Sequence, residues 1–370
     1  MSIKTATITF HASHNYGSML QAYALQQTLF QLGYENEIIN LRTQRQKDLY
    51  KCLSFKSFFK SPKDIIKGLL FLPYMNQLQK KHALFEKFLS DSLKLTKEYA
   101  SLEELEKADF NYDCYISGGD QIWNTAPLDF DWSFYLPFVK KEKRISYAVS
   151  MGPMGEKAVT DRDKIARLLS NYAHISVREE GTKAVVNGLS NKPVSMELDP
   201  ALLLSAEEWN KVIVYNYEEK GDYILLYVPY FKKETYEMAS FLSKKLGLKV
   251  IVTLLGTPKA LLYPFQTKLD VGPIEFLSLV KHAKLIVSGS FHALVFATLF
   301  HVPFYAVNGD KDNRMKTFLN NLNLLNRTID INNRENKWKE AFDCDFTRAE
   351  EYLGIMRKAS LDYLKNAIEK

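Results

Sequence analysis

The sequence predicts an α/β protein made of two doubly wound, Rossmann-like domains. Segments with strand composition alternate with segments of helical periodicity, in two successive series. The chain has 370 residues, which is more than one hydrophobic core usually serves. A polar, irregular stretch over 205–221 separates the two series. We therefore expect an N-terminal domain over 1–212 and a C-terminal domain over 213–370.

The first series opens with a βαβ unit. The β-branched segment "KTATITF" (4–10) predicts a strand, and apolar residues follow it at helical spacing over 16–32. Gly33 stands where a helix C-cap glycine is expected, and "ENEIINLR" (35–42) predicts the second strand. Residues 43–110 are rich in lysine and predict a helical insertion with exposed basic faces.

Strand patterns return after this insertion. Strands are expected at 112–117, 144–152 and 174–177 in the first domain. The second domain repeats the alternation, with strands expected in "DYILLYVPY", "LKVIVTLLG", "KLIVSG" and "VPFYAV". A long helix over 348–370 follows, which we expect to pack back on the first domain. Ligands bind outside the carboxyl ends of the strands in such sheets, so the active site is expected in the cleft between the domains.

Composition narrows the class of protein. The net charge of +6, from 49 basic and 43 acidic residues, is too small for a dedicated nucleic-acid binder, so no nucleic-acid partner is expected. No run reaches roughly 18 consecutive apolar residues, and the N-terminus lacks the form of a signal peptide. The 3 cysteines lie far apart without a C-x-x-C pair, so we expect no metal site and a reducing cytoplasm. The lysine-rich insertion leaves two readings open: a solvated helix face, or peripheral contact with the inner face of the membrane.

The first candidate turn is "HASHNYGSMLQ" (11–21), which joins a strand to a helix. Gly17 permits tight backbone geometry, Ser18 can cap the helix, and the free N–H groups there favour an anion. Neither a Walker A loop nor G-x-G-x-x-G is present. A plain capped turn is the alternative reading. The candidate ligand-binding residues are Asn15, Tyr16, Gly17 and Ser18.

The second candidate turn is "SGGDQIWN" (117–124). Gly118 and Gly119 allow another group to approach the backbone closely. Asp120 can accept hydrogen bonds from sugar hydroxyls, and Trp123 can stack on a sugar face. The alternative is a tight turn with Trp123 in the core. The cluster of polar residues at one strand end favours a binding role, with the further candidates Gln121 and Asn124.

The third and fourth turns carry a cation and a histidine. Arg178 follows an apolar strand in "ISVREEGT", and its guanidinium suits a carboxylate or a phosphate; a salt bridge to a neighbouring acid is the alternative. In "SGSFHALVFATLF" (288–300), Gly289 ends a strand and Ser290 stands at the N-cap position. His292 then falls in the first helical turn, either as a core residue or as the polar group of a cleft. Arg314, in "NGDKDNRMKTFL", either reaches this cleft or only begins the next helix.

Taken together, the motifs resemble the polysaccharide pyruvyl transferase family. They run in the family's order over roughly residues 7–325: "NYGSMLQAYALQ", "SGGDQIWN", "ISYAVSMG", "ISVREEGT", "DPALLL", "SGSFHALVFATL" and "NRMKTFLNNLNL". The resemblance implies a GT-B-like arrangement of the two domains. It also implies transfer of a pyruvyl group from phosphoenolpyruvate to a sugar or lipid-linked oligosaccharide, forming a ketal in surface polysaccharide or exopolysaccharide synthesis, with no separate cofactor.

The resemblance also implies roles for particular residues. The family's arginine falls on Arg178 and its histidine on His292, as donor ligand and proton-transfer residue respectively. Many members place an arginine two residues before that histidine, where this chain has Ser290. A second cation for the donor must then come from Arg314 or a lysine, with Gly289 and Ser290 beside it. Our hypothesis is that Asp120 and Asn124 position the acceptor while Trp123 stacks against it.

Two other functions stay open at this point. A GT-B glycosyltransferase that uses a nucleotide sugar would need an acidic residue in the second domain to hold the ribose, and Glu275 could serve. A non-catalytic protein that binds anionic glycans could use the same cleft without turnover.

Overall fold

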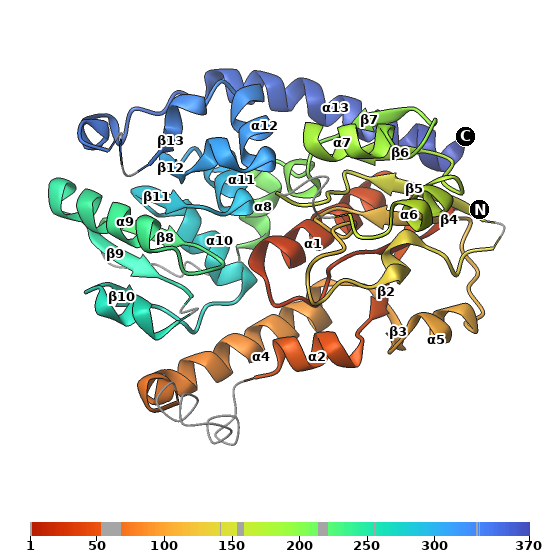
Figure 1. Cartoon of the computed structure of the whole chain (residues 1–370), viewed down its shortest axis with the longest axis horizontal. Coiled ribbons are helices and arrows are strands. Elements are labelled where there is room, and N and C mark those ends of the chain that lie inside the picture. Colours follow the sequence, from red (N-terminus) through yellow and green to blue (C-terminus); the bar gives the residue numbers. More distant parts are fainter. Residues whose placement is uncertain are drawn as a thin grey trace.

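Two parallel β-sheets, one from each half of the chain, lie next to each other (Figure 1). The structure is a computed structural model, and it describes residues 2–52, 68–140, 142–153, 159–213, 221–254, 257–330, 332 and 334–370.

The first sheet has five strands in the order β3-β2-β1-β4-β5. A parallel pair, β6 and β7, continues from β5 through single bridges at Ile145–His174 and Val149–Val177. The strands are β1 (Lys4–Ile8), β2 (Glu35–Leu41), β3 (Leu95–Tyr99), β4 (Cys114–Gly118), β5 (Lys143–Tyr147), β6 (Ile175–Val177) and β7 (Val194–Met196).

The second sheet has six strands in the order β10-β9-β8-β11-β12-β13. All of its pairs are parallel. Its strands are β8 (Tyr223–Tyr227), β9 (Lys249–Val252), β10 (Gln266–Thr267), β11 (Leu285–Ser288), β12 (Phe304–Val307) and β13 (Thr328–Ile329). All five residues of β8 are buried, as expected for a central parallel strand covered on both faces.

The helices connect the strands and cover the sheets. They are α1 (Tyr16–Gln31), α2 (Gln44–Tyr50), α4 (Met75–Ser92), α5 (Leu102–Glu106), α6 (Arg162–Leu169), α7 (Glu180–Asn187), α8 (Ala206–Val212), α9 (Lys233–Leu246), α10 (Pro273–Lys281), α11 (Phe291–Leu299), α12 (Asn313–Asn321) and α13 (Thr347–Glu369). Within the described part of the chain, no helix combines the length and the apolar character that a membrane span requires.

The two sheets share one topology, which locates the site. The strand order reverses between β1 and β4 in the first sheet and between β8 and β11 in the second. Ligands of doubly wound folds bind at such a reversal, beyond the carboxyl ends of the strands. The turns that follow these four strands therefore form the part of the molecule where a site is expected.

Two helices on opposite sides of the molecule tie the halves together (Figure 1). Helix α13 follows the second sheet and packs on β5, where Tyr363 Oη donates to Ser146 O at 2.9 Å and Lys143 Nζ donates to Ile368 O at 2.9 Å. Helix α4 belongs to the first half. Its Lys81 Nζ donates to Thr253 O at 3.0 Å, beyond the end of β9.

Two expectations about secondary structure are wrong in detail. The lysine-rich region 43–110 is not wholly helical, because it contains β3 at the edge of the first sheet. Its two exposed residues, Lys97 and Glu98, are charged, so its composition resembles that of a solvated helix face. The stretch 205–221 contains α8, which a capping box at Ser205 and Glu208 begins. Residues 53–67 and 214–220 lie outside the described part.

Candidate functional site

A cleft of about 820 Å³ opens where the four turns meet, a volume typical of a small-molecule site. Each of the turns that follow β1, β4, β8 and β11 contributes to its walls. Nine of the residues predicted from the sequence line it: Asn15, Ser18, Asp120, Gln121, Asn124, Gly289, Ser290, His292 and Arg314. The lining also includes residues that the sequence did not single out: Lys232, Lys233, Glu234, Asn308, Lys311 and Asp312.

The turn before α1 uses Asn15 as its cap. Asn15 Oδ1 accepts from the N–H groups of Gly17 at 3.0 Å and Ser18 at 3.4 Å, so the expected Ser18 cap is wrong. The Ser18 hydroxyl donates instead to Asp120, across the cleft floor. The sequence predicted that these N–H groups at the start of α1 could bind an anion. Two of them already donate to Asn15.

Tyr16 points away from the cleft, which corrects its assignment as a ligand-binding residue. Its ring stacks on Phe276 at a centroid distance of 4.3 Å, and its hydroxyl donates to Val271 O at 2.9 Å. Tyr16 is 1% exposed. It therefore packs the first half of the chain against the second, and this packing holds the base of the cleft together.

Gly17 does not line the cleft, but its lack of a side chain lets the His292 ring approach the backbone of α1 closely. A Cβ at this position would overlap the imidazole of His292. The missing side chain thus lets the turn before α1 in the first domain touch the start of α11 in the second. This contact fixes one edge of the His292 ring.

The turn after β4 divides its residues between cleft and core. Asp120 faces the cleft from a left-handed backbone conformation, φ 52°. Gly118 and Gly119 lie behind it, where a Cβ would overlap Leu25 and Gln21 respectively. Neither glycine contacts the cleft, so both serve packing rather than ligand binding.

Trp123 does not serve as a stacking platform for a sugar. It is 0% exposed, and its indole stacks on Tyr135 at a centroid distance of 5.1 Å. The predicted stacking role is therefore wrong. The turn reverses the chain so that Asp120, Gln121 and Asn124 face the cleft while the indole is directed into the core.

Arg178 lies behind the cleft at the centre of a buried ionic cluster. Its guanidinium pairs with Asp199, with Glu179 at 3.4 Å and with Asp120 at 3.6 Å, and it lies 4.5 Å from the centroid of the Phe291 ring. The side chain is 1% exposed and is not part of the cleft lining. Arg178 is therefore not placed to bind the donor directly, contrary to our expectation, because three carboxylates already surround its guanidinium.

Asp199 is the residue that sequence reasoning missed. It follows β7 in "DPALLL", and its carboxylate lies between Arg178 and His292, with Oδ2 at 3.4 Å from His292 Nε2. Burial would raise its pKa, but the charges of His292 and Arg178 outweigh burial and hold the pKa well below its ordinary value. Asp199 is therefore ionised at neutral pH, and its charge lies beside His292 Nε2, which has no hydrogen-bond partner within the described residues. The sequence carried one sign of its role, which is that Asp199 follows a strand, as site residues of this fold do.

Glu179 completes the cluster on the side away from the cleft. It accepts from the Thr182 hydroxyl and pairs with Arg178. Burial raises the pKa of Glu179, and the Arg178 charge opposes that rise. The cluster thus holds one guanidinium among three acids, and it presents Asp120 and His292 to the cleft.

The opposite wall carries the start of α11 and several cations. Ser290 is the N-cap of α11, but its side chain caps no N–H group. Arg314 lines the cleft, yet Asp312 already binds it through two hydrogen bonds of 2.6 Å and 3.0 Å. Arg314 therefore reaches the cleft as expected, and its role as a second cation for the donor stays a prediction. Lys232 and Lys311 also line the cleft, and neither forms an ion pair with a carboxylate of the described residues.

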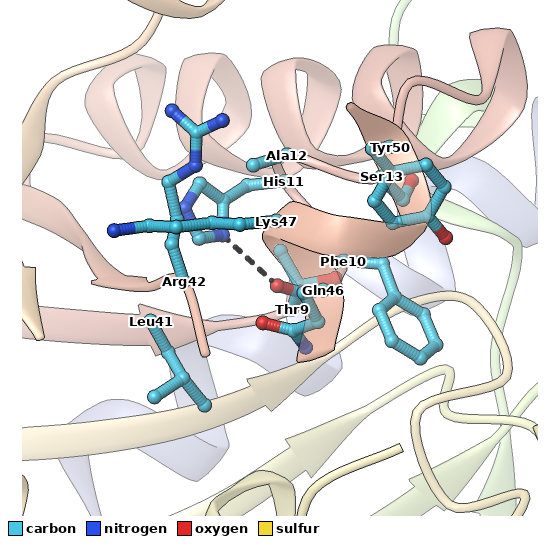
Figure 2. A pocket seen from close by; sticks show the side chains of 10 residues that line it. All are labelled: Thr9, Phe10, His11, Ala12, Ser13, Leu41, Arg42, Gln46, Lys47 and Tyr50. Atoms are coloured by element: carbon cyan, nitrogen blue, oxygen red, sulfur yellow. Dashed lines mark hydrogen bonds between the residues drawn. The ribbon is translucent and has the colours of Figure 1, made fainter. Parts of the chain in front are cut away.

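A much smaller cavity lies beyond the ends of β1 and β2, with α2 as one wall (Figure 2). Figure 2 shows His11 at its centre, where Nδ1 lies 3.1 Å from Thr9 O, with Arg42 and Lys47 alongside. Its volume of about 20 Å³ suffices for a single water but not for a sugar. The larger cleft is therefore the candidate active site.

Comparison with solved structures gives the same fold. The chain resembles a putative UDP-N-acetylglucosamine 2-epimerase from Listeria monocytogenes, with a TM-score of 0.57, 11% identity, and coverage of 97% of this chain and 91% of that chain. It also resembles the S. aureus MnaA–UDP co-structure, with a TM-score of 0.54, 11% identity, and coverage of 96% and 91%. The UDP-N-acetylglucosamine 2-epimerase from Rickettsia bellii has a TM-score of 0.53 and 12% identity, with coverage of 100% and 98%.

The two sheets, the cleft between them and these likenesses define a GT-B-like fold, as the sequence predicted. Residues 15–311 match the polysaccharide pyruvyl transferase family. The chain belongs to this family and is a transferase. A search of curated protein sequences found no match.

Proposed function

We propose that the protein transfers a pyruvyl group from phosphoenolpyruvate to two hydroxyls of a sugar, forming a cyclic ketal. The observation that carries the proposal is the pairing of His292 with Asp199 at the edge of the cleft, with Arg178 behind them. A histidine held by an ionised carboxylate is suited to move protons. The family supports transfer of a pyruvyl group, and the volume of the cleft is in the range of small-molecule sites.

The reaction balances without oxidation or reduction. His292 donates a proton to the methylene carbon of phosphoenolpyruvate, which makes the neighbouring carbon electrophilic. A sugar hydroxyl adds to that carbon and returns a proton to His292. The carbon–oxygen bond to phosphate then breaks, with the electron pair leaving on the phosphate, and a second hydroxyl adds to the same carbon and closes the ketal. The proton of this second hydroxyl passes to the departing phosphate. The products are the ketal and inorganic phosphate, so the proposed chemistry needs no further cofactor.

The two walls take different substrates in this proposal. Asp120, held by Ser18 and lying 3.6 Å from Arg178, accepts hydrogen bonds from the sugar hydroxyls. The donor's carboxylate and phosphate lie toward the start of α11, whose N-cap side chain leaves the N–H groups available. Lys232 and Lys311 supply positive charge there. Arg178 then acts as a positioning residue, because it holds Asp199 and Asp120 in place.

Phosphate release tests this proposal. The purified protein is incubated with phosphoenolpyruvate and a panel of nitrophenyl and lipid-linked sugars, and inorganic phosphate is measured. We expect acceptor-dependent release from at least one sugar, with a mass increase of the product that matches a pyruvyl ketal. Release without an acceptor, or none with any acceptor while a nucleotide sugar is consumed, would contradict it.

The strongest rival is transfer from a nucleotide sugar. It draws support from the UDP in the MnaA co-structure, which shares this fold. The acidic residue expected to hold a ribose, Glu275, accepts from Gly272 N at 3.1 Å and does not line the cleft. Isothermal titration separates the readings: phosphoenolpyruvate should bind and a UDP-sugar should not, whereas glycan alone would indicate a non-catalytic binder.

We also propose a cytoplasmic location, with peripheral contact at the inner face of the membrane. Phosphoenolpyruvate is a cytoplasmic metabolite, and all three cysteines are free. Leu69, Leu70 and Leu72 expose apolar side chains on the lysine-rich region. Cosedimentation with anionic vesicles tests the contact: we expect binding that falls when the three leucines are changed to Gln, and equal binding by both proteins would argue against it.

A further inference from the structure

Three potential metal ligands converge outside the cleft, between α4 and the turn before α1. His82 and Glu86 lie one turn apart on α4, and His14 faces them from the turn. One ligand atom from each lies within 4.8 Å of the others. His14 Nε2 is 2.7 Å from Glu86 Oε1. Two imidazoles and one carboxylate, in this proximity, match the ligand set of zinc sites.

His82 supplies a second observation. Its ring lies edge-to-face with His14, with centroids 4.6 Å apart, yet within the described residues it has no hydrogen-bond partner. His82 is half-buried, and one of its ring nitrogens lies within 4.8 Å of the ligand atoms of His14 and Glu86.

Glu86 is held in place by Arg42. Arg42 Nη1 reaches Glu86 Oε2 at 3.1 Å and Arg42 Nη2 reaches Oε1 at 2.9 Å. Because a metal needs only one of the two oxygens, Arg42 can keep the other as an outer partner of the site.

His14 itself is held in a conformation that is costly for a histidine. Its φ is 45°, in the left-handed region that residues with a Cβ seldom adopt. The ring is fixed by stacking on Phe85, at a centroid distance of 5.2 Å. The backbone thus places the imidazole against α4 before any ligand arrives.

We propose that His14, His82 and Glu86 bind a divalent transition-metal ion, with zinc best matched to two imidazoles and a carboxylate. The three protein ligands leave a coordination position for water. The ion joins α4 to the turn that leads into Asn15. Since α4 also binds the second domain, through Lys80–Asp270 at 2.8 Å and Lys81–Thr253, the ion fastens the helix that bridges the two halves.

Metal titration of the full chain tests the site without any assay of activity. After dialysis against a chelator, the protein is titrated with Zn²⁺ by calorimetry and with Co²⁺ by visible absorption. We expect one ion per chain and Co²⁺ bands typical of nitrogen and oxygen ligands. His82→Ala should weaken the affinity at least about tenfold, because it removes one of three ligands. The fold should survive, since His82 makes no hydrogen bond to lose.

The matched control is His301→Ala. His301 lies 3.2 Å from Glu350 of α13, so it also pairs with a carboxylate, but this pair is more exposed and no second histidine belongs to it in the described part of the chain. This variant should bind metal like the wild type. Zn²⁺ should raise the melting temperature of the wild type and of His301→Ala, but not that of His82→Ala. Equal binding by all three proteins, or no saturable binding by the wild type, would overturn the proposal. The three residues would then form only a hydrogen-bonded network.

Discussion

The two walls of the cleft differ in how completely their polar groups are paired. On the first-domain wall, Ser18 binds Asp120, and Arg178 pairs with three carboxylates. On the second-domain wall, the start of α11 has no side-chain cap, and Lys232 and Lys311 have no carboxylate partner within the described residues. One wall is therefore built before substrate arrives, and the other offers groups for substrate to bind.

This difference separates positioning from binding. Charges in the buried cluster, although costly to desolvate, compensate one another and hold His292 and Asp120 in fixed places. Charges on the facing wall are exposed, so each should contribute less and respond to salt. Changes in the cluster should thus affect turnover and stability strongly, and changes in the exposed wall should affect donor binding weakly.

The largest effect is expected from His292→Ala. We expect turnover to fall about 10²–10⁴-fold, because proton transfer by a positioned side chain contributes about that much. Phosphate release measures the loss, and circular dichroism checks the fold. His301→Ala, which changes an exposed histidine far from the cluster, should keep normal turnover. Near-normal turnover in His292→Ala would remove this residue from the mechanism.

Arg178→Met tests the cluster as a structural unit. Loss of the cation leaves Asp199 and Glu179 buried without a counter-charge, so the free energy of unfolding should fall by about 3–5 kcal/mol. Guanidinium denaturation measures this change. Lys107→Met, which breaks an exposed pair with Glu103, should lose nothing measurable. A small loss in both variants would show that the three acids do not depend on Arg178.

Gly17→Ala tests the contact between the two walls. The added methyl should displace the His292 ring, and we expect turnover to fall about 10- to 100-fold. Stability should also fall, by about 1–3 kcal/mol, because the added carbon overlaps His292 and the surrounding packing must shift. Gly354→Ala is the matched control: this helical glycine has open space around it, so turnover should stay unchanged. Normal turnover with a crystal structure showing an undisturbed ring would contradict the prediction.

The pH dependence of stability should report on Asp199. Its folded pKa is lowered, so the stability it contributes is present above the ordinary carboxylate pKa of about 3.9 and is lost as the pH falls below it. The carboxylate itself stays ionised from pH 7 to about 5, so the loss that its own protonation causes should be absent in that range. Below pH 4 the advantage of the wild type over Asp199→Asn should shrink by up to about 1.4 kcal/mol per pH unit. Denaturation curves at several pH values test this, and a constant difference down to pH 3 would contradict it.

The smallest effect is expected on the exposed wall. Lys232→Ala and Lys311→Ala should each raise the KM for phosphoenolpyruvate a few-fold at low salt, since an exposed ion pair contributes about 0–1 kcal/mol. The effect should fade at high salt, and kcat should change little. Lys259→Ala, an exposed lysine outside the cleft lining, is the control. An effect that is independent of salt would show that these lysines act other than by charge.

The sequence alone determined the fold class and the approximate place of the site. Alternating periods of 2 and 3.6 residues are local signals, since burial of a strand or helix face is written along the chain itself. The ends of predicted strands located three of the turns that form the cleft, those after β1, β4 and β11, but not the turn after β8, and nine of the fifteen candidate residues line the cleft. His292 and Asp120 could be singled out because each follows a strand.

Only the tertiary structure decided which way each side chain faces. Tyr16 and Trp123 stand beside residues that line the cleft, but packing against Phe276 and Tyr135 turned both inward. Asp199 could not be tied to Arg178 and His292, because β7 and the second domain bring these groups together from distant parts of the chain. The sequence also did not reveal that Asp312 forms an ion pair with Arg314. Side-chain direction and charge pairing depend on neighbours that are distant in sequence, and local periodicity carries no information about them.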